Sequence, residues 1–457
     1  MGRIFGTDGA RGVANTEISC TLAMDIGRAV GMVISEKTDR RPRILIGRDT
    51  RISGDMLQNA VAAGLCSVGA DVMLLGVVPT PAVAYLTTEM GADAGIMLSA
   101  SHNPYEFNGI KVFGPQGFKL TDEQEFEIEE IVLDKTIPFS VQWGARIGRI
   151  YEEKNAAERY ISHLLSTIEG PLGGICVALD CSNGSASATA RALFERAGAF
   201  VTVFHAGPDG INVNDRCGST HIETLASLVK SGKFDCGFAF DGDADRCLGV
   251  TAGGELVDGD RIIAILAKDL HARGKLTNDT AVITVMSNLG FHKFCEREGL
   301  HAAVTKVGDR YVLENMLENG YAVGGEQSGH IILREYMTTG DGQLTALQLL
   351  AVMKRTGKTL KELADVMQVY PQVTVNVRAD PYMKKQLELD EGVRREVERV
   401  RAALGDSGRV LVRVSGTEPL IRVMLEGMDE EYIRKEAEQI AEVIRERLGN
   451  NESDQGL

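Results

Sequence analysis

Arg43-Ile-Leu-Ile46 opens the stretch of sequence that decides the fold, and Gly95-Ile-Met-Leu98 closes it. Between these two apolar, strand-like runs the sequence predicts a helix over 55–68, a strand over 71–75 and a helix over 81–90. Short apolar runs that alternate with helical segments are typical of a largely parallel sheet covered by helices. The stretch therefore predicts an α/β domain.

The same alternation recurs twice along the chain. The second set of elements is predicted over 174–179, 185–197, 200–204, 222–231 and 236–240, and the third over 262–270, 281–285, 290–298, 302–305 and 309–318. Beyond two prolines at 371 and 381, a charged helix, two strands and a second charged helix are predicted over 391–403, 409–414, 420–426 and 430–448. This pattern indicates three similar α/β domains with mixed, largely parallel sheets and a smaller C-terminal α+β domain. We expect four domains around a central cleft, at 1–150, 151–255, 256–370 and 371–457.

The composition excludes several classes of protein. With 457 residues, of which 44% are hydrophobic and 25% charged, the chain is long enough for several buried cores. Its formal net charge of -15 argues against a general nucleic-acid or membrane-surface binder, because such surfaces are bound by basic faces. An anionic substrate would be repelled at long range, so a phosphate site must gather its own local cations and backbone amides.

Cysteine usage and hydropathy indicate a cytoplasmic protein. The eight cysteines include no Cys-x-x-Cys pair and lie mostly inside apolar runs, which favours reduced core thiols over disulfides or zinc ligands. No run of about 18 apolar residues is present, and the N-terminus lacks the apolar core of a signal peptide. We expect neither nucleic acid nor membrane as a partner.

An acidic loop, Asp241-Gly-Asp-Ala-Asp-Arg246, follows a predicted strand. Each pair of like charges at such spacing costs about 1 kcal/mol in water and up to ~4 kcal/mol in a partly buried site. A divalent cation would remove this cost, and ligands that are all oxygen suit Mg²⁺ better than Zn²⁺. A solvated acidic turn is the alternative. An EF-hand is disfavoured, because Arg246 stands where that loop needs Gly and Ala252 where it needs Glu.

Three further polar loops also follow apolar runs. They are Ser99-Ala-Ser-His-Asn-Pro104, Gly324-Gly-Glu-Gln-Ser-Gly-His330 and Arg413-Val-Ser-Gly-Thr-Glu-Pro419. Ligands of open α/β sheets bind beyond the carboxyl ends of the strands, so all four loops are expected to share one site. Ser101 alone could be a capping serine or carry a covalent group, and the arginine loop could be a simple turn or cradle a phosphate. Gly357-Lys-Thr359 is not read as a nucleotide loop, because Val352 stands where the first Gly is required.

Together the four loops resemble the active site of the α-D-phosphohexomutase superfamily, and most closely that of the bacterial phosphoglucosamine mutases. Residues 99–104 match the phosphoserine loop of the family at every position, and the resemblance extends from residue 1 to about 447. Three positions depart from the usual pattern. Ala244 replaces a glycine of the metal loop, Val414 replaces a proline of the phosphate loop, and Ala10 replaces Val or Ile near Arg11.

The resemblance implies a role for each loop. Ser101 would carry a phosphoryl group and bind one Mg²⁺ per chain together with Asp241, Asp243 and Asp245. The residues implied to serve catalysis are His102, Lys111, Arg11 and His330. Lys111 or Arg11 could instead be a surface cation, and His330 could simply be packed in the core. The residues implied to bind substrate are Glu326, Ser328, Arg413, Ser415, Gly416 and Thr417.

The resemblance also implies the reaction. A phosphoglucosamine mutase is an isomerase that interconverts glucosamine 6-phosphate and glucosamine 1-phosphate through phosphoserine and a 1,6-bisphosphate, toward bacterial cell-wall amino sugars. The activating phosphate on Ser101 would come from a sugar 1,6-bisphosphate or from autophosphorylation. The C-terminal domain is expected to close over the bound hexosamine phosphate, and the enzyme to be a monomer or homodimer. Alternatives are a phosphoglucomutase or phosphomannomutase, an aspartyl phosphatase, and a non-catalytic sugar-phosphate-binding protein.

Overall fold

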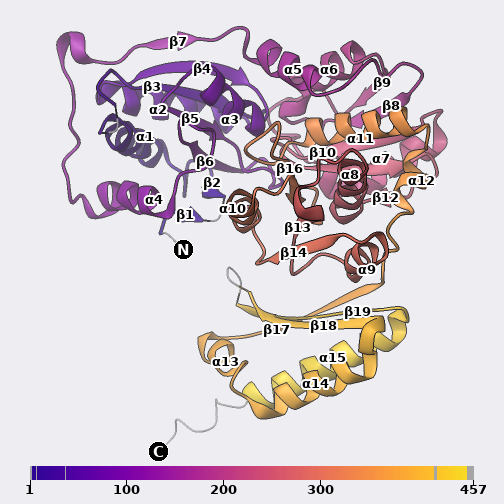
Figure 1. Cartoon of the computed structure of the whole chain (residues 1–457). Coiled ribbons are helices and arrows are strands. Elements are labelled where there is room, and N and C mark those ends of the chain that lie inside the picture. Colours follow the sequence, from indigo (N-terminus) through magenta and orange to yellow (C-terminus); the bar gives the residue numbers. More distant parts are fainter. Residues whose placement is uncertain (1–2, 7, 37, 416–418, 450–457) are drawn as a thin grey trace, which may run out of the picture. The chain divides into compact units, whose positions relative to one another are not determined.

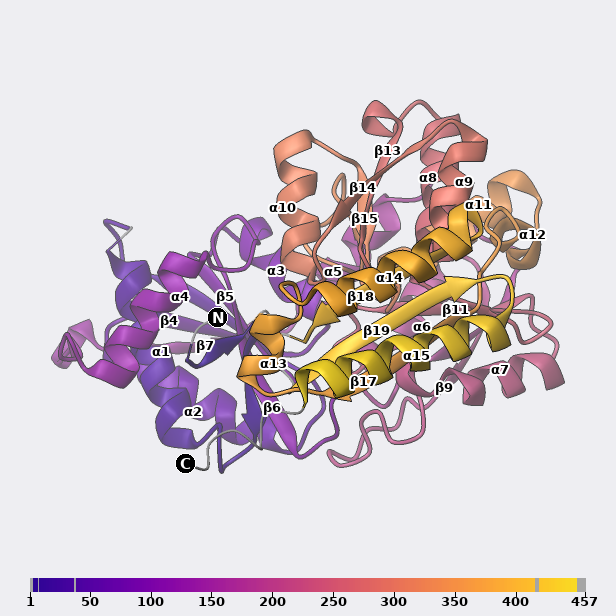
Figure 2. The same cartoon turned by 90° about the horizontal axis from the view of Figure 1, so that it is seen from below.

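The computed structural model describes residues 3–6, 8–36, 38–415 and 419–449. The chain forms two compact units. The first contains the residues up to Met286 together with Leu300–Val366, and the second contains Ser287–Gly299 together with the residues from Met367 onward. Three sheets belong to the first unit and the fourth to the second (Figures 1 and 2).

The first sheet has seven strands in the order β1-β2-β6-β5-β3-β4-β7. Strand β3 pairs in parallel with β4 and β5, and β4 with β7, whereas β5–β6, β6–β2 and β2–β1 are antiparallel. The strands are β1 (Phe5–Gly6), β2 (Gly9–Val13), β3 (Arg43–Arg48), β4 (Asp71–Val77), β5 (Ala94–Leu98), β6 (Phe107–Phe113) and β7 (Ile150–Glu152). The sequence predicted β3, β4 and β5, and it missed β1, β2, β6 and β7.

Helices flank this sheet because successive strand residues point to opposite faces (Figure 1). Ile44 and Ile46 belong to a core shared with helices α1 and α2. Gly47 and Gly95 instead face Val83 of α3, where an added Cβ would lie 2.5 and 3.0 Å from its methyl carbons. The helical segments are α1 (Cys20–Ser35), α2 (Ser53–Ser67), α3 (Thr80–Glu89), α4 (Asp122–Glu129), a π turn η1 (Glu130–Asp134) and a 3₁₀ turn η2 (Gly144–Arg146).

The second sheet has five strands in the order β12-β11-β10-β8-β9, with β8 parallel to β9 and β10. Its strands are β8 (Cys176–Asp180), β9 (Phe200–Phe204), β10 (Cys236–Phe240), β11 (Cys247–Thr251) and β12 (Leu256–Val257). The helical segments are α5 (Ala156–Ser166), η3 (Ser185–Ala188), α6 (Ala190–Arg196), η4 (Ser219–His221) and α7 (Ile222–Ser231). The helix predicted over 185–197 is divided into η3 and α6, because Thr189 has a non-helical φ of -129°.

The third sheet has four strands in the order β14-β13-β15-β16. Strand β13 is parallel to β14 and β15, and β15 is antiparallel to β16. The elements are α8 (Gly259–Ala272), η5 (Thr277–Asp279), β13 (Thr280–Thr284), β14 (His301–Thr305), α10 (Asp309–Asn319), β15 (Val323–Gly325), β16 (Ile331–Leu333), α11 (Gly342–Thr356) and α12 (Leu360–Ala364). Helix α11 is buried from Gly342 to Met353, as expected of a helix inside a core.

The C-terminal unit is an antiparallel sheet, β17-β19-β18, with α14 and α15 covering one face (Figures 1 and 2). Its elements are α9 (Leu289–Glu298), β17 (Gln372–Arg378), α13 (Pro381–Gln386), α14 (Glu391–Leu404), η6 (Gly405–Ser407), β18 (Gly408–Val414), β19 (Leu420–Gly427) and α15 (Glu430–Leu448). Helix α9 joins this unit because Leu289 N donates to Glu426 Oε2 at 3.2 Å, and Arg409 Nη2 donates to Ser287 O at 2.7 Å. The sequence predicted this helix within the domain at 256–370, a limit that stays a prediction.

The predicted fold class is confirmed, with mixed sheets in an α/β layout and a separate α+β unit. The predicted limits of the four domains stay a prediction. All eight cysteines are free thiols, five of them buried. Among the described helices, none combines the length and apolar character that crossing a bilayer needs.

Candidate active site

Ser101 lies in the loop that follows β5 and is only 1% exposed. Its backbone is left-handed, with a φ of 50°, and its N–H donates to Ser99 Oγ at 2.9 Å. Ser99 Oγ in turn donates to Asp49 Oδ2 at 2.6 Å. The Ser101 hydroxyl donates to Asp241 Oδ2 at 2.6 Å. The serine and the acidic loop, which are 140 residues apart in sequence, therefore meet.

The acidic loop follows β10, and one oxygen from each of Asp241, Asp243 and Asp245 lies within 4.8 Å of the other two. All three side chains are buried. Burial and the charges of Asp245 and Asp243 raise the pKa of Asp241 well above its ordinary value. Asp243 Oδ1 and Asp245 Oδ1 are buried and accept no hydrogen bond from the described part of the chain. Buried, unpaired carboxylate oxygens in this number fit a divalent cation.

Ala244 is left-handed, with a φ of 57°, at the position where the family usually has glycine. Glycine adopts this left-handed region without strain, whereas a residue with a Cβ does not. The carboxylates nevertheless converge. The alanine therefore strains the loop, by about 1–2 kcal/mol, without opening it.

Lys111, on β6, occupies the space between the carboxylates. Its Nζ lies 2.9 Å from Asp243 Oδ2, 3.3 Å from Asp245 Oδ2 and 2.9 Å from Asp8 Oδ2. Burial alone would lower the pKa of Lys111, but these carboxylates hold it well above its ordinary value. A fully charged ammonium therefore lies where a phosphate near the metal would need a partner.

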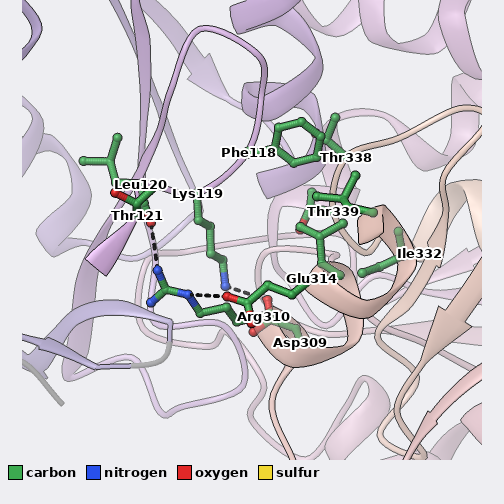
Figure 3. A pocket seen from close by; sticks show the side chains of 12 residues that line it. Phe118, Lys119, Leu120, Thr121, Asp309, Arg310, Glu314, Ile332, Thr338 and Thr339 are labelled. Carbon is green, nitrogen blue, oxygen red and sulfur yellow. Dashed lines mark hydrogen bonds and ion pairs between the residues drawn. The ribbon is translucent and has the colours of Figure 1, made fainter. Parts of the chain in front are cut away.

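Asp8 connects Lys111 with two other cations. Its Oδ2 lies 2.6 Å from Arg11 Nη2, and its Oδ1 accepts from Lys119 Nζ at 2.6 Å. Lys119 Nζ also donates to Asp309 Oδ2 at 2.6 Å, so it links the first sheet's loops with α10 (Figure 3). These two residues border a pocket of about 270 Å³, which is also lined by Phe118, Leu120, Thr121, Arg310, Leu313, Glu314, Leu317, Ile332, Thr338 and Thr339.

Glu326 and Ser328 lie in the turn between β15 and β16. Glu326 Oε1 accepts the N–H of Gly308 at 3.0 Å, which ties the turn to the start of α10. Ser328 is exposed at the tip of the turn. Their side chains are therefore placed to meet a ligand from solvent rather than to complete a core.

The two candidate histidines have different surroundings. His330 is buried, and its Nε2 accepts the N–H of Gly340 at 3.1 Å, while its Nδ1 lies 3.7 Å from Asp245 Oδ2. Burial by itself would lower the pKa of His330. The carboxylate of Asp245 raises this pKa by more than burial lowers it, so the pKa lies above its ordinary value. His102 Nδ1 lies 3.4 Å from Ser101 Oγ, and burial together with Arg246 and Arg11 lowers its pKa to about 4. His102 is therefore neutral at pH 7.

The C-terminal loop belongs to the second unit. Arg413 on β18 stands directly opposite Arg422 on β19, and Arg413 Nε is buried with no hydrogen-bond partner among the described residues. Burial and the charge of Arg422 lower the pKa of Arg413. Ser415 N donates to Leu420 O at 2.9 Å. Gly416 and Thr417 lie outside the described residues. Two guanidinium groups side by side repel each other, and an anion would relieve this repulsion.

Four domain families match the chain in order. Domains I, II, III and IV of phosphoglucomutase/phosphomannomutase match residues 2–137, 158–254, 258–370 and 352–443. The phosphoglucosamine mutase of Acetivibrio thermocellus is 53% identical over 98% of this chain and 100% of its own length. The chain belongs to the phosphohexomutase superfamily. Within that superfamily the chain is similar to other bacterial phosphoglucosamine mutases, including that of Caldicellulosiruptor saccharolyticus, which is 52% identical over 98% of this chain and 100% of its own length.

Solved structures of phosphohexomutases share the fold. A phosphoglucomutase/phosphomannomutase family protein from Burkholderia thailandensis superposes with a TM-score of 0.82 at 23% identity, over 97% of each chain. The N-acetylphosphoglucosamine mutase of Aspergillus fumigatus, solved with GlcNAc-6P and magnesium, gives 0.67 at 18% identity, over 97% of this chain and 95% of that one. As a phosphohexomutase, the chain is an isomerase.

Sequence reasoning missed two residues of this phosphohexomutase that hold the serine loop. Arg51 is 1% exposed, donates to Ser101 O at 2.9 Å and to Asn103 O at 2.8 Å, and pairs with Asp49. Asn214 Nδ2 donates to the same two carbonyls at 2.9 and 3.1 Å. Arg51 lies just after the carboxyl end of β3, as the four recognised loops lie after their strands. The rule that sites form beyond the carboxyl ends of strands could therefore have identified it.

Proposed function

We propose that this chain is a phosphoglucosamine mutase that interconverts glucosamine 6-phosphate and glucosamine 1-phosphate. The observation that carries the proposal is the 2.6 Å contact between the Ser101 hydroxyl and Asp241, beside two carboxylates with unpaired buried oxygens. A phosphoserine needs such a setting, because its charge of about -1.5 to -2 must be neutralised where it is kept from water. The choice of glucosamine phosphate as substrate rests on the similarity of the chain to bacterial phosphoglucosamine mutases.

The reaction balances as two phosphoryl transfers. Phosphoserine 101 would donate its phosphoryl group to the free hydroxyl of the sugar phosphate. A new O–P bond forms as the Ser101 O–P bond breaks, and the proton lost by the sugar hydroxyl is balanced by the proton that the Ser101 oxygen gains. The 1,6-bisphosphate would then reorient and return its other phosphoryl group to the Ser101 oxygen. Little covalent chemistry is left to the protein, and positioning and charge stabilisation do most of the work.

Asp241, Asp243 and Asp245 would hold Mg²⁺ together with an oxygen of the phosphorylated Ser101. The ion would withdraw negative charge from the phosphoryl oxygens. Lys111, which now lies against Asp243 and Asp245, would be free to turn to the transferring phosphoryl group. Arg11 lies close to the serine loop at 99–104, since its Nη1 donates to Asn103 Oδ1 at 3.4 Å.

Substrate recognition would use two sets of residues. Glu326 and Ser328 would hydrogen-bond hydroxyl or amino groups of the sugar. Polar partners that the bound sugar covers discriminate strongly against a sugar that lacks the matching group. Arg413, Ser415, Gly416 and Thr417 would bind the phosphate that is not being transferred.

We propose supporting roles for the two histidines. His330 accepts a backbone N–H at Nε2 and faces Asp245 with Nδ1, so it would orient the metal-binding carboxylate rather than reach the sugar. An added Cβ at Gly340 would lie 2.5 Å from the imidazole ring, which explains the glycine there. Neutral His102 would accept or donate one hydrogen bond at the Ser101 oxygen.

The experiment that tests the proposal combines mass spectrometry with kinetics. We expect an added phosphate on the 99–111 peptide of the purified protein, and Mg²⁺-dependent turnover of glucosamine 6-phosphate with a higher kcat/KM than for glucose or mannose phosphates. Ser101→Ala should lose both the phosphate and the activity. Preferred turnover of glucose or mannose phosphate would make the chain a phosphoglucomutase or phosphomannomutase. Binding without turnover would make it a sugar-phosphate-binding protein, and activity retained in Ser101→Ala would reject the phosphoserine.

Cytoplasmic location, a monomeric or homodimeric state and the source of the activating phosphate stay predictions. Size-exclusion chromatography with light scattering would measure the oligomeric state. Incubation of dephosphorylated enzyme with a sugar 1,6-bisphosphate, or with no donor other than its own substrate, would separate the two sources of phosphate.

A further inference from the structure

A second group of metal-ligand side chains lies at the carboxyl edge of the five-stranded sheet. Asp180 ends β8, His205 follows β9, and Cys217 lies in the loop before η4. One ligand atom from each of the three lies within 4.8 Å of the other two. The Asp180 carboxylate and Cys217 are fully buried, and the His205 side chain is 32% exposed.

Backbone groups fix the Asp180 carboxylate in this group. Ser182 N donates to Asp180 Oδ1, and Gly218 N donates to Asp180 Oδ2, both at 2.9 Å. His205 Nδ1 lies 3.0 Å from the same Oδ2. The carboxylate and imidazole are therefore held in place before any ligand binds.

Cys217 completes the set. Its sulfur is 3.9 Å from Asn183 Nδ2 and lies beside the other two ligand atoms. The Asp180 carboxylate and the His205 imidazole alone could form a simple ion pair. Such a pair does not require the thiol of Cys217 beside it. Thiolate, imidazole and carboxylate are together the ligands that Zn²⁺ takes, whereas Mg²⁺ takes oxygen.

We propose that Asp180, His205 and Cys217 form a zinc-binding site that is separate from the acidic loop. Tetrahedral Zn²⁺ with bonds of about 2.0–2.3 Å would place its ligand atoms roughly 3.3–3.6 Å apart, so the observed cluster needs only small movements. Thiolate and carboxylate together balance the +2 charge. Of the three ligands, only His205 has a partly exposed side chain.

The site would stiffen the loops that support Ser101. Asn183 O accepts the Thr50 hydroxyl at 2.6 Å, and Asn214, three residues before Cys217, donates to Ser101 O at 2.9 Å. The zinc would touch neither the sugar nor the phosphoserine. Its ligands are positioning residues, and binding should raise the thermal midpoint of the protein by several degrees.

Cobalt substitution tests the proposal, because a thiolate ligand gives Co²⁺ a near-ultraviolet charge-transfer band that oxygen ligands do not give. Metal-stripped full-length protein should develop this band with one equivalent of Co²⁺ and lose it on addition of Zn²⁺. Cys217→Ser should abolish the band. Two matched controls should keep it: Cys236→Ala, which removes a buried thiol from β10, and Asp243→Asn, which alters the oxygen-only loop.

His205→Gln gives an independent measurement, because its partly exposed side chain can be changed with little risk to folding. It should weaken Co²⁺ binding at least tenfold. Absence of the band in wild-type protein, or its persistence in Cys217→Ser, would overturn the zinc site. An unchanged Co²⁺ affinity in His205→Gln would overturn it as well, whether or not Cys217→Ser folds.

Discussion

Ala244 has a strained backbone and lies between two of the carboxylates that are proposed to bind the metal. Its φ of 57° is tolerated by alanine at a cost of about 1–2 kcal/mol, but a β-branched side chain fits this region far less well. Ala244 is also fully buried, so a larger side chain overpacks the loop by roughly 1–3 kcal/mol. We therefore predict that Ala244→Val lowers Mg²⁺ affinity at least tenfold and the unfolding free energy by at least ~2 kcal/mol, measured by calorimetric titration and urea denaturation.

Ala244→Gly is the matched control for this prediction. It relieves the left-handed strain but removes a buried methyl group and adds backbone freedom to the unfolded chain. These effects oppose each other, so stability should stay within about 1 kcal/mol of wild type and Mg²⁺ affinity should be kept. Full Mg²⁺ affinity in Ala244→Val would show that the loop tolerates a different backbone from the one described.

Arg51 determines the shape of the serine loop. It is buried, pairs with Asp49 and donates to the carbonyls of Ser101 and Asn103. Removing one partner of a buried ion pair leaves an uncompensated charge and costs about 3–5 kcal/mol. Arg51→Met should lower the unfolding free energy by this amount and reduce kcat at least tenfold.

Arg48→Met provides the comparison for Arg51, because Arg48 pairs with the 72% exposed Asp55 side chain. Exposed pairs contribute about 0–1 kcal/mol. Urea denaturation of both variants measures the contrast. Equal stability losses in the two would contradict the role assigned to Arg51.

At the scale of single elements, the N-terminus of α11 contains a buried titratable group. Asp341 accepts the Leu344 N–H at 2.9 Å and the Tyr160 hydroxyl at 2.8 Å, and burial raises its pKa to about 7. Between about pH 4 and 7 the folded protein therefore binds a proton that the unfolded chain has released. Over this window the contribution of Asp341 to stability falls as pH rises, and above pH 7 the loss is complete.

Asp341→Asn should flatten the fall in stability between pH 4 and 7. Asparagine caps a helix as well as aspartate does and can accept the Tyr160 hydroxyl, so the fold should be kept. Urea midpoints at pH 5 and pH 8 measure the effect. The wild type should lose more stability than the variant between the two pH values, and a parallel loss in both would contradict the raised pKa.

Helices and strands were predicted more accurately from the sequence where a local pattern of residues defines them than where they depend on contacts with distant segments. Strands β9 and β10 and helices α7 and α15 were predicted with their observed limits, because each has a clear periodicity and a turn at each end. Strand β7 was missed, since its three residues are all exposed, are too few to show an alternating pattern, and pair only with β4. Helix α9 was predicted correctly, but its membership of the C-terminal unit depends on Glu426 and Arg409, more than a hundred residues away.

The candidate site could be predicted only where residues form a continuous motif. The 99–104 and 241–246 loops were recognisable, and the structure brings Ser101 to Asp241. Asp8, Lys119 and Asp309 form their contacts across distant segments, so no spacing in the sequence indicated them. The same reason explains why Asp180, His205 and Cys217 gave no zinc signal from cysteine spacing.

At the scale of the whole molecule, the two units contain different parts of the proposed site. Ser101 and the three aspartates belong to the first unit, and Arg413 and Ser415 belong to the second. The second unit has its own core and its own helix-covered sheet, so it can move as a body. The chain crosses between the units after Met286, Gly299 and Val366, which makes these the positions at which a hinge would bend.

We predict that glucosamine 6-phosphate with Mg²⁺ reduces the radius of gyration of the full-length enzyme in solution scattering. The phosphate bound by Arg413 would couple the second unit to a sugar held by the first, and excluding water would protect the phosphoserine from hydrolysis. Arg413→Ala removes a charge-assisted contact of about 1.5–3 kcal/mol, so it should raise KM roughly tenfold to a hundredfold and abolish the contraction. Arg434→Ala removes the same charge from an exposed pair with Glu430 on α15 and should change neither quantity. If wild-type scattering is the same with and without saturating ligand, the second unit does not close, and Arg413 must act from a fixed position.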